Sequence, residues 1–168
     1  MLRAAIASVA LILTASLAAG QTPADSRLKR IADSKTIKIG YRAAATPFSF
    51  FNQQTKEPAG YTIDLCRLAA EWIGKSLNAP LKIEWVEVTT QNRFDLVAQG
   101  KADMECGSST ITLTRMQQVD FSSVTFVEST GMIVKANGGV AKAGDFSGQK
   151  IAVAAGTTNE AALAELVK

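Results

Sequence analysis

The sequence predicts an α/β fold whose strands pair mainly in parallel. Segments with the period of a strand alternate along the chain with segments whose apolar residues recur at helical spacing. This order is typical of a parallel sheet covered by helices. Of the 168 residues, 47% are hydrophobic and 20% are charged, which is a globular composition. The length indicates one domain, or one domain and part of a second.

Residues 1–20 have the features of a secretory signal peptide. Arg3 supplies the basic end, an apolar run follows, and small residues lead up to Gly20. The apolar run is too short to span a membrane comfortably, and Gln21 stands where a lipoprotein would need a cysteine. We therefore expect cleavage after Gly20, a polar lead-in over 21–27 and a mature protein in the bacterial periplasm.

The first half of the mature chain reads as helix, strand, loop and helix. Alternating apolar residues predict a strand at 36–41, and apolar residues spaced three and four apart predict a helix at 61–77. A short helical turn is expected at 28–32. Between strand and helix, the polar and Pro-containing segment 42–60 predicts a loop with a hairpin-like excursion.

The second half continues the alternation of strands and helices. The expected elements are a strand at 81–88, a helix ending at Gly100, strands at 102–106, 131–135 and 150–155, a short helix at 113–119, and a helix after Gly156. Thr89 or Thr90 can cap the helix that ends at Gly100, and Thr157 has the spacing of a capping box with Glu160. The last strand and helix find no partner later in the sequence, so we expect a fragment of a longer protein.

Composition excludes several kinds of chemistry. Histidine is absent, which excludes Ser–His or Cys–His catalysis and His-ligated metals, and the two cysteines cannot make a zinc site alone. We expect no metal or cofactor, and we assign no residue a catalytic role. The net charge of +3 is too small and too dispersed to predict a nucleic-acid surface.

Cys66 and Cys106 form an even pair in a protein expected in an oxidising compartment. Cys66 lies on the flank of the predicted helix, and Cys106 ends a strand of the sheet that this helix should cover. A disulfide is one interpretation. Two buried free thiols, or pairing with a cysteine outside this sequence, are the others.

Three arginines follow strands or begin helices, namely Arg42, Arg93 and Arg115. In an open α/β sheet, ligands collect beyond the carboxyl ends of the strands. Guanidinium groups that converge there would hold carboxylates, because each offers a planar pair of donors. The alternative is that each arginine is a solvated surface charge.

Hydroxyl and aromatic residues accompany these arginines. Thr90, Ser108, Thr110 and Thr158 stand at the same turns and could complete the hydrogen bonds to a bound zwitterion, although Ser and Thr also cap helices and fill turns. Phe48, in a loop with Pro47, belongs either to the core or to an apolar wall against the aliphatic part of a ligand.

Seven stretches match a known family in the order in which they occur. They are GYR (40–42), TPFSF (46–50), GYTIDLC (60–66), QNR (91–93), ADMECGSST (102–110), QVDFS (118–122) and AAGTTNE (154–160). Together they resemble the periplasmic amino-acid-binding proteins of ABC importers, solute-binding protein family 3, and specifically the glutamate/aspartate-binding branch. The resemblance extends from about residue 28 to Lys168.

This resemblance implies a type II periplasmic-binding-protein-like fold with two lobes and a ligand between them. Residues 28–126 would form most of lobe one, and 127–168 would be the hinge crossover and the beginning of lobe two. It also implies a protein that is monomeric at full length. Such a protein would bind L-glutamate or L-aspartate and deliver it to ABC permease subunits at the inner membrane, without nucleic acid as a partner.

The resemblance also assigns roles to matching residues. Arg115, with Thr110 and Thr158, would hold the α-carboxylate of the ligand. Arg42, Arg93 and Thr90 would hold its side-chain carboxylate. Ser108 resembles a partner of the α-ammonium group.

Two other functions remain open from the sequence. The same two-lobed fold hosts dehydratases, which need a positioned acid or base, and Asp64, Glu105 and Asp120 are the carboxylates near the motifs. No two of them form a pair at catalytic spacing. A receptor or sensor domain would require a transmembrane helix, and none is predicted after the signal peptide.

Overall fold

The computed structural model describes residues 26–139 and 142–166. The predicted signal peptide at 1–20 and most of the lead-in lie outside these residues. Within the described ranges, no helix is long and apolar enough to cross a membrane.

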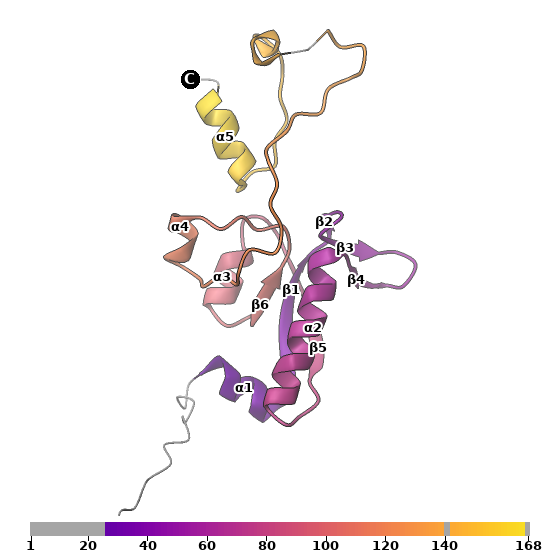
Figure 1. The fold of residues 1–168 in the computed structure, drawn as a ribbon, viewed down its shortest axis with the longest axis vertical. Helices are drawn as coiled ribbons and strands as arrows, with labels where there is room; N and C mark the ends of the chain where they lie inside the picture. The colour runs from indigo at the N-terminus through magenta and orange to yellow at the C-terminus, as the bar shows by residue number, and fades with distance from the viewer. Residues whose placement is uncertain (1–25, 140–141, 167–168) are drawn as a thin grey trace, which may run out of the picture.

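A three-stranded parallel sheet forms the centre of the main body (Figure 1). β1 (Thr36–Arg42) lies between β5 (Lys82–Val88) and β6 (Met104–Cys106). Paired residues run in register from Thr36 opposite Lys82 to Arg42 opposite Val88, so the carboxyl ends of β1 and β5 coincide. The strands predicted at 36–41, 81–88 and 102–106 and their parallel pairing are confirmed. Because the strands are parallel, the loops that follow them meet at one edge.

Four helices accompany this sheet, and they are α1 (Arg27–Ser34), α2 (Tyr61–Ser76), α3 (Arg93–Ala98) and α4 (Leu113–Met116). Ile37 and Ile39 of β1 and Ile63 of α2 are fully buried together in the core. The predicted long helix is confirmed as α2.

α3 ends where the sequence predicts. Gly100 adopts φ +69°, its N–H donates to the Val97 carbonyl, and the Lys101 N–H donates to the Leu96 carbonyl. These are the two hydrogen bonds of a Schellman motif, which needs a left-handed residue at the position of Gly100. At the other end, Thr89 Oγ1 accepts from the backbone N–H groups of the turn that leads into the helix.

The segment 42–60 is more regular than the predicted loop. It forms a small antiparallel sheet of β2 (Ala44–Ala45), β3 (Ser49–Asn52) and β4 (Glu57–Ala59). Asn52 Oδ1 accepts from the N–H groups of Gln54 and Thr55 and so closes the turn between β3 and β4. The strands are too short for sequence periodicity to reveal, and backbone pairing across this turn defines them.

Beyond the main body the chain rises in an extended passage, forms the short 3₁₀ helix η1 (Ala143–Phe146), and returns to α5 (Thr158–Leu166) (Figure 1). The strands predicted at 131–135 and 150–155 are wrong, since neither segment belongs to a described sheet. A strand needs a neighbour that pairs with its backbone groups, and within the described residues neither segment has one. α5 itself is confirmed, because Thr157 Oγ1 accepts from the Glu160 N–H at 3.2 Å.

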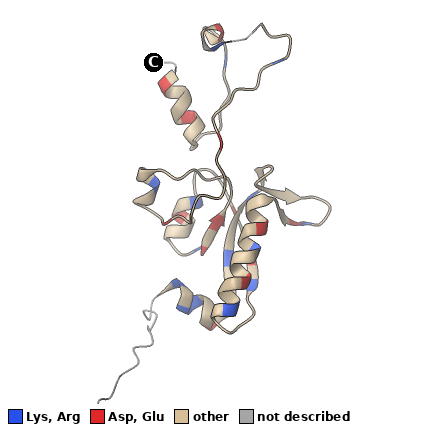
Figure 2. Cartoon of the chain, in the orientation of Figure 1, with Lys and Arg blue, Asp and Glu red and all other residues tan. Residues whose placement is uncertain are grey.

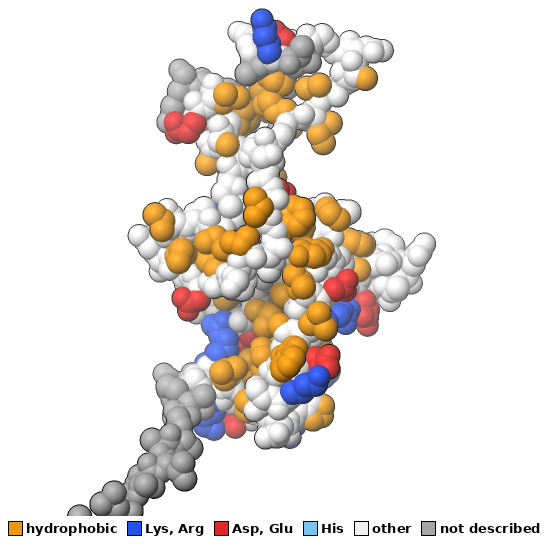
Figure 3. Space-filling model, viewed as in Figure 1, with side chains coloured by type: hydrophobic (Ala, Val, Ile, Leu, Met, Phe, Trp, Pro, Cys, Tyr) orange, Lys and Arg blue, Asp and Glu red, His pale blue; other side chains and the backbone are white. Residues whose placement is uncertain are grey.

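Apolar side chains remain exposed along these passages. Figure 3 shows hydrophobic side chains over the upper part of the molecule and where that part joins the main body. The large ones with high exposure include Val124, Phe126, Val127, Met132, Ile133, Val134 and Val153.

Cys66 and Cys106 form a disulfide with a Cα–Cα distance of 6.4 Å. Of the three interpretations of the cysteines, the disulfide is therefore the one that the structure confirms. The bond ties the first half of α2 to the last residue of β6, beside the loop that enters the predicted site.

Candidate functional site

The three predicted arginines lie at the carboxyl edge of the parallel sheet. Arg42 is the last residue of β1, Arg93 begins the helix that follows β5, and Arg115 lies in α4, which follows β6. Figure 2 shows basic residues on α3 and α4 close to an acidic stretch on β6. The parallel order of β5, β1 and β6 therefore places the three cations at one end of the sheet.

Arg93 is the most deeply placed of the three, with only 2% of its surface exposed. Burial lowers the pKa of its guanidinium, the charge of Glu105 opposes this shift, and the positive charges of Arg115 and Arg42 add to it. Its Nη2 donates to the Gly156 carbonyl at 3.4 Å, while its buried Nε has no hydrogen-bond partner among the described residues. A buried N–H without a partner is costly, so this group is available to an acceptor that enters the site.

Arg115 donates to the same carbonyl. Its Nη2 donates to the Gly156 oxygen at 3.3 Å and its Nη1 to the Thr110 carbonyl at 2.8 Å. Both guanidiniums lie near the Phe94 ring, at 4.8 Å for Arg93 and 5.0 Å for Arg115. One backbone oxygen thus accepts from two guanidiniums, and two such donors would also suit a carboxylate oxygen.

Two of the predicted threonines join this group directly. The hydroxyls of Thr110 and Thr158 lie 3.2 Å apart, so they link the loop after β6 to the start of α5. Thr90 lies close through its backbone, because a Cβ added to Gly156 would be 3.2 Å from the Thr90 carbonyl. Its hydroxyl donates to Gln91 Oε1.

The remaining predicted residues are not held in this group by any described contact. Ser108 is exposed and makes no hydrogen bond to another described residue. Phe48 packs edge-on against Phe126, with ring centres 5.0 Å apart, and against Tyr61 at 6.2 Å. Phe48 therefore belongs to an aromatic cluster at the exit of the main body.

Sequence reasoning missed the place of Glu105 in this cluster. Glu105 lies opposite Gly40 in the register of β6 and β1, two residues before Arg42 on the neighbouring strand. Its Oε1 is buried and has no hydrogen-bond partner among the described residues. Burial raises the pKa of its carboxyl, and the nearby Ser109, Arg93 and Arg42 oppose that rise. One feature of the sequence could have indicated this place. An acidic residue stands at the end of one predicted strand, and another predicted strand ends in arginine.

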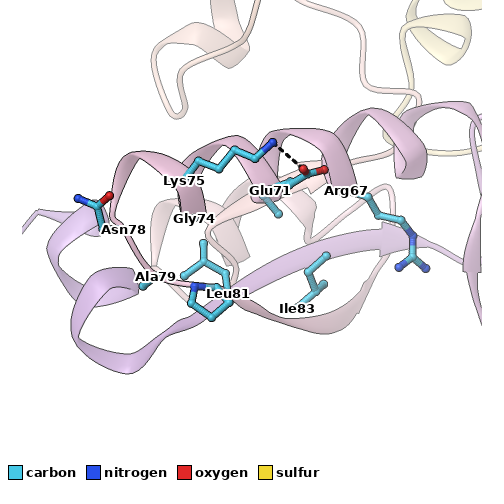
Figure 4. Close-up of a pocket in the computed structure, with 10 residues that line it drawn as sticks. Arg67, Glu71, Gly74, Lys75, Asn78, Ala79, Leu81 and Ile83 are labelled. Atoms are coloured by element: carbon cyan, nitrogen blue, oxygen red, sulfur yellow. Dashed lines mark ion pairs between the residues drawn. The ribbon is translucent and has the colours of Figure 1, made fainter.

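A groove of about 590 Å³ lies elsewhere on the main body, between the second half of α2 and β5 (Figure 4). Leu81 and Ile83 lie beneath the helix, and the Lys75–Glu71 ion pair lies on the helix. None of the predicted site residues lines it. The groove and the arginine cluster are therefore separate features.

The family model of the bacterial extracellular solute-binding proteins, family 3, matches residues 37–166. The chain belongs to this family.

Two curated relatives are similar over most of the chain. The glutamate/aspartate import solute-binding protein of Salmonella typhimurium is 36% identical over 88% of this chain and 49% of its own length. The L-glutamate/L-aspartate-binding protein of Pseudomonas aeruginosa is 37% identical over 92% and 51%. The chain thus spans about half the length of these relatives.

A solved structure confirms the fold of this family 3 protein. The ancestral amino acid-binding protein that is a precursor of cyclohexadienyl dehydratase superposes with a TM-score of 0.74 at 29% identity. The alignment covers 84% of this chain and 61% of that one. The predicted type II binding-protein-like α/β fold is therefore confirmed.

Proposed function

We propose that this family 3 protein is the periplasmic solute-binding component of an ABC importer for an acidic amino acid, L-glutamate or L-aspartate. It captures the amino acid as a monomer and delivers it to the permease subunits at the inner membrane. The observation that carries the proposal is the pair of guanidiniums, Arg93 and Arg115, that flank one oxygen atom at the carboxyl edge of the sheet.

The charge of this edge favours an anionic ligand. Three cations, Arg42, Arg93 and Arg115, act on the single carboxylate of Glu105. An amino acid with two carboxylates compensates the remaining positive charge, whereas a neutral side chain leaves a guanidinium desolvated and unpaired. The names of the two curated relatives, which state glutamate and aspartate, support the same class of ligand.

The positions of the arginines suggest a division of labour. Arg115 with Thr110 and Thr158 would hold the α-carboxylate, since the three are joined by hydrogen bonds across the loop after β6 and the start of α5. Arg42 and Arg93, with Thr90, would hold the side-chain carboxylate deeper in the site. Ser108 would accept from the α-ammonium and Phe48 would border the aliphatic part. No residue is assigned a catalytic role.

Calorimetric titration of the mature protein, expressed from its own gene, tests the ligand class. We expect L-glutamate or L-aspartate to bind at least about a hundredfold more tightly than L-glutamine, because the amide leaves a buried guanidinium without its anion. L-lysine and L-leucine serve as controls that share the α-carboxylate and ammonium. Equal affinity for L-lysine or L-leucine would contradict the proposal.

A further inference from the structure

The aromatic ring of Phe94, on α3, contacts two of the three arginines of the cluster. The guanidinium carbon of Arg93 lies 4.8 Å from the centre of this ring, and that of Arg115 lies 5.0 Å from it. Both distances are within the range in which the negative face of a ring attracts a cation. Arg93 belongs to the same helix as Phe94, whereas Arg115 belongs to α4. One ring thus joins the cations of two helices that follow different strands.

No carboxylate takes the place of this ring. Among the described residues, neither Arg93 nor Arg115 forms an ion pair. A side-chain carboxylate would compete with a ligand carboxylate, because both accept from the same N–H groups. A ring attracts the guanidinium without using these donors. Arg115 demonstrates this, since its Nη1 and Nη2 donate to two backbone carbonyls while its guanidinium lies over the ring.

Two contacts from the segment after α4 hold Phe94 in position. Its ring packs against the ring of Phe121, with 6.1 Å between the ring centres. Gln118 Nε2 donates to the carboxylate of Asp95, the residue next to Phe94. Gln118 and Phe121 belong to the stretch QVDFS (118–122), which matches the family but carries none of the predicted site residues. These contacts join α3 to the segment after α4 and so fix the ring relative to both helices that carry its arginines.

The ring acts on two like charges that lie close together. Arg93 and Arg115 donate to the same carbonyl oxygen, so their guanidiniums repel each other at short range. The negative face of the Phe94 ring offsets part of this repulsion and restricts both side chains before a ligand arrives. Ordering them in advance removes an entropic cost that binding would otherwise include. The ring contact can persist in the complex, because a carboxylate binds the N–H groups of the guanidinium.

We propose that Phe94 is a positioning residue, whose ring sets the spacing of Arg93 and Arg115 and thereby the separation of the two ligand carboxylates that the site accepts. This inference rests on the proposed function, in which Arg115 holds the α-carboxylate and Arg93 the side-chain carboxylate. The ring acts through its charge distribution as well as its bulk. An aliphatic side chain therefore does not replace it.

Fluorinated phenylalanines at position 94 separate the charge distribution of the ring from its bulk. Rings with one, two and three fluorine atoms keep nearly the same shape, but their negative face weakens with each fluorine. We expect the affinity of the mature protein for L-glutamate, measured by calorimetry, to fall stepwise by about tenfold over the series. L-glutamine should lose less, since it offers one carboxylate to the two arginines. Phe94→Leu should lose about as much as the last member of the series, whereas Phe94→Tyr keeps the ring and should stay within about twofold of the unmodified protein.

The same replacements at Phe51 provide the matched control. Phe51 is half-buried like Phe94 and packs against the Tyr41 ring, but no cation of the described residues lies over it. Glutamate affinity should therefore stay constant in that series. Constant affinity through the Phe94 series, or an equal fall at Phe51, overturns the role of Phe94, while glutamate binding by the unmodified protein leaves the proposed function intact. Absence of any binding of acidic amino acids by the unmodified protein overturns both proposals together.

Discussion

At the scale of single residues, Arg93 and Arg115 differ in what surrounds them. Arg93 is buried at the start of α3, whereas Arg115 is half-buried in α4 and donates to two backbone carbonyls. Removing either guanidinium takes away a charge-assisted contact. The loss of affinity should nevertheless depend on the ligand. Arg115 is assigned to the α-carboxylate, which all amino acids share, and Arg93 to the side-chain carboxylate, which only acidic ones carry.

Arg115→Ala should weaken binding of L-glutamate and L-glutamine alike, since both carry an α-carboxylate. Arg93→Met, which keeps an unbranched side chain in the buried position, should weaken L-glutamate and change L-glutamine little. Each loss should reach about 2 kcal/mol or more, roughly thirtyfold in affinity. Titration of both ligands into both variants measures the two ratios. If the variants show identical glutamate-to-glutamine ratios, the division of labour is wrong.

The convergence of these arginines could be predicted because parallel strands end at one edge of a sheet. In the sequence, Arg42 directly follows one predicted strand and Arg93 lies in the turn after the next. The contact of Arg93 with the Gly156 carbonyl could not be predicted, because it joins residues 63 positions apart. The place of Glu105 in the cluster was hidden for a related reason. Its side chain direction depends on the space above Gly107, which only the folded backbone reveals.

At the scale of elements, periodicity predicted those that a core supports. β1 alternates buried isoleucines, as its sequence predicts. α2 forms where the apolar spacing predicts a helix, but it buries the face of Ile63, Ala70 and Gly74 and leaves Leu68 and Trp72 of the predicted stripe exposed. The strands predicted at 131–135 and 150–155 have equally apolar sequences, yet Ile133 is fully exposed. An apolar run specifies a strand only when a second strand pairs with it. The small sheet of β2, β3 and β4 is the converse case, where pairing exists without a periodic signal.

The disulfide is the element-scale feature with the largest expected effect on stability. The Cys66–Cys106 bond closes a loop with a sequence separation of 40 residues. Cross-linking such a loop restricts the unfolded chain and should contribute about 3–4 kcal/mol to the free energy of unfolding. Reduction should therefore shift the urea midpoint to lower concentration.

The variant Cys66→Ala/Cys106→Ala provides the control for that experiment. It should match the reduced protein in stability and should not respond to the reductant. If the oxidised protein and this double variant unfold at the same urea concentration, the bond contributes nothing to stability. Glutamate affinity measured in parallel shows whether the bond at Cys106 also holds the loop after β6 in the geometry that binding needs.

At the scale of the whole molecule, two regions differ in how their backbone is held. β1 pairs on both sides, with β5 and with β6, and its core residues are fully buried. The passage at 150–155 belongs to no described sheet, and most of its residues are exposed. The connection between the two regions includes the hydrogen bonds of Gly156 to Arg93 and Arg115. The division into lobes at 28–126 and 127–168 stays a prediction.

Hydrogen exchange followed by mass spectrometry measures this difference directly. We expect amides at 150–155 to exchange at least about a thousandfold faster than those of β1, because the former open locally and the latter only by global unfolding. L-glutamate should slow exchange around Gly156 and Thr158, since its carboxylate would bridge the arginines to the start of α5. L-lysine is the control, as it lacks the second carboxylate. Exchange at 150–155 as slow as in β1 would show that a paired strand forms there after all, and glutamate without effect at 156–158 would separate α5 from the binding site.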